Sequence, residues 1–268
     1  MINSRLPAFT TENEELTRRL EQLNLEFLNL FTRHKDMVEN ESPVLTSLYL
    51  EKLGRLKLEL LEKQTEESRL RMKMNMIQAA INRDENPDLK KIDFEINNLL
   101  QDYYSRIKQQ SAALDTAEKV LSSMLTEEET KKLKEAFRLL CKRLHPDINP
   151  NQSEEEKDLF IKATAAYDLL DISELQKIIL YLDESNRENL GLVSGNEKKE
   201  RIMHLEKNIA RLEEKIILLK AGFPFNIQDM LYDDEQVRKK QDELRNQITE
   251  AEKEIGRYSE IINIMCDE

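Results

Sequence analysis

The 268-residue sequence has no tryptophan, five glycines, six prolines and two cysteines, and only 6% of its residues are aromatic. This scarcity of aromatic residues and glycine is more typical of long helices than of a large globular core. The cysteines, Cys141 and Cys266, lie far apart and form no CxxC pair. They give no basis for a disulfide framework or a cysteine-based zinc site.

The sequence also lacks long apolar runs and an excess of positive charge. No apolar stretch is long enough to span a bilayer, and the first residues do not combine a basic segment with an apolar one, as a secretory signal does. A net charge of −12 argues against a general binder of nucleic acid or of acidic membranes. We therefore expect a cytoplasmic protein that binds neither nucleic acid nor membranes.

What the sequence has instead is charge, at 35% of residues, and apolar side chains repeated at helical spacing. Residues 1–123 carry heptad-like seams, with new helices expected at Ser42-Pro43 and Asn86-Pro87, where a cap residue precedes a proline. Residues 197–268 carry two further seams separated by Gly222 and Pro224. Both regions are expected to form long antiparallel coiled-coil hairpins, paired within the chain or between two copies in a homodimer.

The region 124–184 differs, because it predicts short helices. Three capping boxes, each a serine or threonine followed three residues later by Glu or Gln, predict helices over 126–144, 153–170 and 173–184. A polar segment with two glycines follows, and 185–196 is expected to be a linker. The fold class expected is therefore all-α, with a short-helix module between coiled-coil hairpins.

The first short helix combines a buried stripe with a basic flank. Four apolar residues at helical spacing predict the stripe: Leu133, Phe137, Leu140 and Leu144. Between Thr130 and His145 six Lys or Arg oppose one acid, which gives a local charge of +5 in an acidic chain. The flank could be a solvated face with cations near a helix C-terminus, or a docking surface for an acidic partner.

A tripeptide, His145-Pro146-Asp147, follows this helix directly. Pro146 cannot continue a helix and restricts His145 to extended geometry, so the imidazole and the carboxylate should project from a fixed turn. The second short helix carries one apolar face, composed of Phe160, Ala163, Ala166, Tyr167 and Leu170. Small residues on that face allow the two helices to pack closely, with the tripeptide at one end of the pair.

These residues together resemble the J-domain of the DnaJ co-chaperone family, over about residues 126–171. The resemblance implies that the chain binds a DnaK-type chaperone and stimulates its ATPase through the histidine, proline and aspartate of the turn, while the coiled coils bind a client protein not identifiable from sequence. The implied contact residues are His145, Pro146, Asp147, Lys134, Arg138, Lys142 and Arg143, with no catalytic residue, metal or cofactor in this chain.

The sequence departs from the family in the helix that precedes the basic one. The family's usual Asp-Tyr-Tyr sequence stands here at residues 102–104, too far upstream, so the end of a helix over 87–123 is expected to serve as the first helix of the module. An alternative is therefore a structural coiled-coil scaffold with an inactive J-like module. An enzyme is disfavoured, because His34, His145 and His204 show no metal-binding spacing and no nucleophile motif accompanies them.

Overall fold

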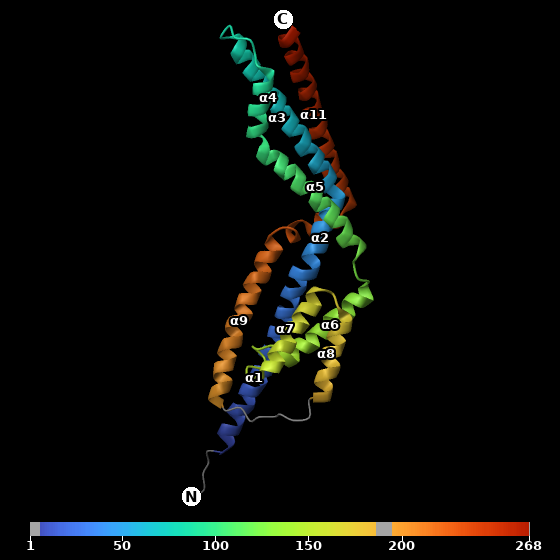
Figure 1. Ribbon diagram of the computed structural model, residues 1–268. Coiled ribbons are helices and arrows are strands. Elements are labelled where there is room, and N and C mark those ends of the chain that lie inside the picture. The colour runs from blue at the N-terminus through green and yellow to red at the C-terminus, as the bar shows by residue number, and fades with distance from the viewer. Residues whose placement is uncertain (1–5, 186–194, 268) are drawn as a thin grey trace. The chain divides into compact units, whose positions relative to one another are not determined.

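The computed structural model describes residues 6–185 and 195–267, and every regular element in these ranges is helical (Figure 1). This confirms the all-α fold class. None of the described helices is both long enough and apolar enough to cross a membrane. The chain divides into two compact units, Met1–Pro43 with Met124–Asn226, and Val44–Ser123 with Ile227–Glu268.

The first unit is built from α1 (Leu6–Asp36), a π-helical segment η1 (Met37–Glu41), α6 (Glu127–Leu144), α7 (Glu154–Asp168), α8 (Ile172–Ser185) and α9 (Gly195–Ala221). Helices α6, α7 and α8 pack on one another, as Figure 1 shows. The stripe predicted from Leu133 to Leu144 is fully buried, and the rings of Phe137 and Tyr167 stack at 4.1 Å. The short-helix pair therefore encloses its own core.

Two of the three capping boxes are confirmed. Thr126 pairs with Glu129 at the start of α6, and Ser153 pairs with Glu156 at the start of α7, each in both directions. The third prediction is wrong, because α8 already begins at Ile172 and Ser173 lies inside it. The carboxylate of Asp171 instead accepts the Glu174 N–H at 3.0 Å, so an aspartate caps this helix.

The core of the module is completed by α1, not by the helix expected from residues 87–123. Leu28 is buried in this core, and Phe31 packs against it. The α5 helix (Gln101–Ser122) belongs to the second unit, where it packs on η2, α3 and α4. The prediction that the helix over 87–123 would complete this core was wrong because an apolar stripe at helical spacing can pack on any helix. The spacing alone does not identify the helix on which it packs.

The second unit contains most of α2 (Ser42–Tyr49), the π-helical η2 (Leu50–Gly54), α3 (Arg55–Ile81), α4 (Leu89–Leu99), α5, α10 (Gln228–Tyr232) and α11 (Asp234–Asp267). A short 3-10 segment, η3 (Phe225–Ile227), lies at the boundary of the units. Helix α3 runs beside α11 (Figure 1), and apolar clusters join the two along their length.

The two helices expected to form a C-terminal hairpin over 197–268 each pack on an N-terminal helix. Helix α9 packs on α1 in the first unit, through Leu205, Ile209 and Leu212 against Leu23 and Phe27, whereas α11 packs on α3 in the second. The apolar seam of each helix is therefore buried within its own unit, against an N-terminal helix. Of the predicted linker 185–196, residues 186–194 lie outside the described residues.

Two expected helix starts also differ. Asp36 and Ser42 both have right-handed helical dihedrals around η1, so Ser42 is not an extended N-cap. The proline that follows it is accommodated within helical backbone. At the second break, Asp88 is the N-cap of α4 and accepts the N–H groups of Lys90 and Lys91, two residues beyond the expected Asn86.

Gly54 gives a test of the packing in the second unit. A β-carbon at this position would lie 2.5 Å from the Leu114 side chain of α5, whereas one at Gly256 on α11 would meet no atom within 4 Å. We expect Gly54→Leu to lower the free energy of unfolding by about 1–3 kcal/mol through overpacking. The matched Gly256→Leu should be neutral or stabilising, because it removes a helical glycine. Chemical denaturation measures both, and equal stability of the two variants would contradict the α5 packing.

Candidate functional site

The loop that follows α6 is held in a fixed turn by its own polar side chains. His145 ends the helix with extended dihedrals, as expected for a residue before proline, and its carbonyl accepts the N–H groups of Ile148 and Asn149 at 3.0 and 2.8 Å. The Asn149 side chain donates to the carbonyls of Lys142 and Arg143. These carbonyls lack partners within the helix, so the loop caps the end of α6.

The His145 side chain points inward, contrary to the expectation that it projects from the turn. It is 6% exposed and lies edge-on to the rings of Phe27, Phe31 and Phe160, at centroid distances of 4.8, 4.4 and 5.1 Å. Its Nδ1 accepts the backbone N–H of Asp147 at 3.1 Å. Burial lowers the pKa of His145 to about 4 despite the nearby Asp147 carboxylate, so the imidazole is neutral at pH 7.

Asp147 and Pro146 face helix α9. The Asp147 carboxylate is partly exposed, accepts a hydrogen bond from the Asn208 side chain at 3.0 Å and lies 3.8 Å from Nδ1 of His204. Pro146 is exposed. A hollow of about 340 Å³ separates the loop from α9, lined by Pro146, Asp147 and Pro150 on one side and by Glu200, Arg201 and His204 on the other. The turn therefore lies next to α9.

The four basic residues expected to steer a partner fall into two pairs. Lys134 forms an ion pair with Asp36 of α1 at 2.7 Å, and Arg143 pairs with Asp183 of α8. Arg138 and Lys142 are exposed, and neither forms an ion pair with any of the described side chains. Two of the four predicted basic residues, Lys134 and Arg143, are therefore paired with acids of this chain, and the other two, Arg138 and Lys142, are exposed to solvent.

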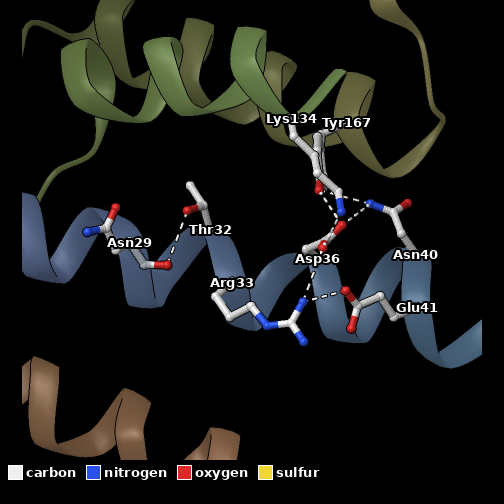
Figure 2. Close-up of polar contacts among 8 residues, drawn as sticks. All are labelled: Asn29, Thr32, Arg33, Asp36, Asn40, Glu41, Lys134 and Tyr167. Carbon is white, nitrogen blue, oxygen red and sulfur yellow. Dashed lines mark hydrogen bonds and ion pairs between the residues drawn. The ribbon is translucent and has the colours of Figure 1, made fainter. Parts of the chain in front are cut away.

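Asp36 is the centre of a polar cluster that ties α1 to the short-helix module (Figure 2). It is 5% exposed, and besides the Lys134 ion pair its carboxylate accepts hydrogen bonds from the Tyr167 hydroxyl and the Asn40 side chain at 3.2 and 3.1 Å. Burial raises the pKa of Asp36, but the hydrogen bonds from Lys134 and Asn40, together with the positive charge of Lys134, outweigh burial and lower that pKa overall. The carboxylate is therefore ionised at neutral pH.

Sequence reasoning missed this cluster and the residues around His145. Asp36 and Tyr167 are 131 residues apart, and neither spacing nor composition relates them. Phe27 falls within the seams predicted over residues 1–123, and His204 falls within those predicted over 197–268, so neither pattern indicates a contact with the turn. The sequence near the turn indicated only the tripeptide itself, because many of the side chains that contact the tripeptide come from the distant helices α1 and α9.

Among the described residues, no group of three or more His, Cys, Asp or Glu side chains is placed to hold a metal ion. Cys141 is buried in the module core, where burial raises the pKa of its thiol, and Cys266 is exposed. Neither cysteine is bonded to the other.

The Asp36 cluster predicts a pH-dependent contribution to stability. Because folding lowers the pKa of Asp36 from its ordinary 3.8, its contribution is present above pH 3.8 and is lost as the pH falls through the lower, folded value. Asp36→Asn should reduce the free energy of unfolding at pH 7 by about 1.5–3 kcal/mol, the range for hydrogen bonds to a charged group. The difference from wild type should shrink below pH 3.8.

Denaturant unfolding at pH 7 and pH 3 measures this difference. The control is Asp115→Asn, which changes the same charge at an exposed position of α5. A difference between wild type and Asp36→Asn that is the same at both pH values would show that the carboxylate is not held ionised by its neighbours.

Comparison of the chain with protein-family models, curated proteins and solved structures finds no match, so the arrangement of its own residues carries the functional argument.

Proposed function

We propose that this chain is a J-domain-type co-chaperone that binds a DnaK-type ATPase chaperone and stimulates its ATP hydrolysis through His145, Pro146 and Asp147. The observation that carries the proposal is the position of this tripeptide, in the loop between two antiparallel packed helices and directly after the basic flank of α6. The chain then performs no chemistry of its own, because hydrolysis takes place in the partner.

Three features support the proposal. The turn is fixed by capping interactions, so its residues are presented in one geometry. Pro146 is exposed at the tip, and Arg138 and Lys142 stand open on the preceding helix. An open basic pair in a chain of net charge −12 suits an acidic partner surface, which it would attract at long range.

In this proposal the second unit contacts a client protein or a second copy of the chain in a cytoplasmic assembly. Helices α4 and α5 expose several large apolar side chains that could serve such contacts, namely Phe94, Leu99, Tyr103 and Tyr104.

The second candidate is a structural scaffold with an inactive J-like module. The burial of His145 favours it, since an imidazole that is 6% exposed offers little surface to a partner. The two candidates differ in whether the tripeptide activates an ATPase.

Steady-state ATPase of several DnaK-type chaperones tests the proposal directly. We expect wild-type chain to stimulate hydrolysis in a saturable manner and Pro146→Ala and Asp147→Asn to abolish most of the effect, because both residues lie at the turn surface. His145→Gln should do the same, and His34→Gln on α1 is its matched control. Absence of stimulation by wild type at any concentration, with every chaperone tried, would favour the scaffold.

The open basic pair predicts a separate effect on association. Arg138→Glu with Lys142→Glu should slow chaperone binding and reduce its dependence on salt, without loss of helicity, because both side chains are exposed. Arg238→Glu with Lys239→Glu makes the same charge change on exposed positions of α11. Stopped-flow binding at low and physiological salt measures the rates. Equal rates for the two double variants would rule out steering by the α6 flank.

A further inference from the structure

The residues of the turn are not equally accessible, and α9 accounts for the difference. Asn208 donates a hydrogen bond to the Asp147 carboxylate, and His204 lies 3.8 Å from the same group. Ile148, the next residue of the loop, packs against the apolar cluster shared by α1 and α9. Helix α9 therefore occupies the side of the turn on which the carboxylate is presented.

Helix α9 also seals His145 indirectly. Phe27 lies 4.8 Å from the imidazole and is 2% exposed, and it belongs to the cluster formed with Leu205, Ile209 and Leu212. Removal of these three side chains would leave Phe27 without its covering layer. Helix α9 thus controls the access of a partner to the carboxylate directly, and it contacts the imidazole indirectly, through Phe27 of α1.

Helices α1 and α9 are attached through different residues. Helix α1 is anchored to the module through Leu28 in the core and through the buried Asp36 cluster. Helix α9 contacts the loop through the Asn208–Asp147 hydrogen bond, and it is held on α1 by its apolar seam, by the Arg19–Glu206 and Lys199–Glu12 ion pairs and by hydrogen bonds from Lys198. The contacts of α1 with the module do not involve α9, so separation of α9 breaks its contacts with α1 and with the loop but leaves the contacts between α1 and the module.

We infer that α9 is a built-in cover, an autoinhibitory helix that masks the Asp147 side of the His145-Pro146-Asp147 turn and must separate from it before a chaperone can bind. This inference rests on the proposed function, since it names the regulation of the same site. If the competent, uncovered state is a minor fraction, the apparent affinity for the chaperone is reduced by that fraction, whereas the activity at saturation is not.

Asn208→Asp tests the cover with almost no change in shape. It replaces the donor to Asp147 with a second carboxylate, so a hydrogen bond to a charged group is lost and like charges face each other. We expect the chain concentration for half-maximal ATPase stimulation to fall about tenfold, which corresponds to about 1.4 kcal/mol, with an unchanged plateau. Asn196→Asp, the same change at an exposed position of α9, should behave as wild type.

Leu205→Ala provides a second route without a change of charge. It weakens the seam of α9 on α1, where Leu205 is 1% exposed, and should also lower the half-maximal concentration. Its control is Leu244→Ala, which makes the same truncation in the α11 seam of the second unit. Amide hydrogen exchange over residues 202–216 reports separation of α9 without a chaperone, because a helix that leaves its partner exchanges faster.

The outcomes separate the two proposals. A lower half-maximal concentration for Asn208→Asp and Leu205→Ala, with faster exchange of α9, supports the cover. Stimulation by both variants equal to that by wild type overturns the cover and leaves the proposed function standing. Faster exchange of α9 with no stimulation by any form overturns the proposed function, and the cover with it, because an open turn then activates nothing.

Discussion

The burial of one imidazole organises the first unit. His145 lies against Phe27 and Phe31 of α1 and Phe160 of α7, so residues from three parts of the chain meet at the end of α6. The cost of desolvating a charged imidazole keeps His145 neutral, and a neutral Nδ1 can accept the Asp147 N–H. That hydrogen bond fixes the turn and directs the Asp147 carboxylate toward α9.

The packing of α1 and α8 on α6 pairs some of the basic residues of α6 and leaves others exposed. Since α1 lies along the module, its buried Asp36 can reach Lys134, and Arg143 is paired on the other side by Asp183. Arg138 and Lys142 are left in solvent. A flank that the sequence presents as a continuous basic surface is therefore reduced to its outer part, and any acidic partner would meet these two residues first.

Local structure was predictable because its causes are local. The buried stripe of α6 and the capping boxes at Thr126 and Ser153 depend on residues three or four apart, and the structure has them as expected. The cap of α8 was missed because two candidate residues, Asp171 and Ser173, stand close together and the choice between them depends on how α7 ends. The helical path through Ser42-Pro43 was missed because the proline is tolerated where η1 precedes it.

Helix pairing was not predictable in the same way. The seams of α9 and α11 are both apolar, and nothing in their spacing says that one belongs on α1 and the other on α3. The environment of the turn follows from that pairing, so the sequence could indicate the tripeptide but not that Asn208 would contact it. The missing information was tertiary: contacts between residues more than 60 positions apart.

The central claim is that the turn is packed beneath α1 and α9, with His145 buried and neutral. Nuclear magnetic resonance titration of the His145 ring protons in the wild-type chain measures this most directly. The account predicts a pKa of about 4, against an ordinary value of 6.5. Titration of His145 near 6.5 would show that its ring is in solvent, and would contradict both the packing of the turn and the cover that α9 forms over it.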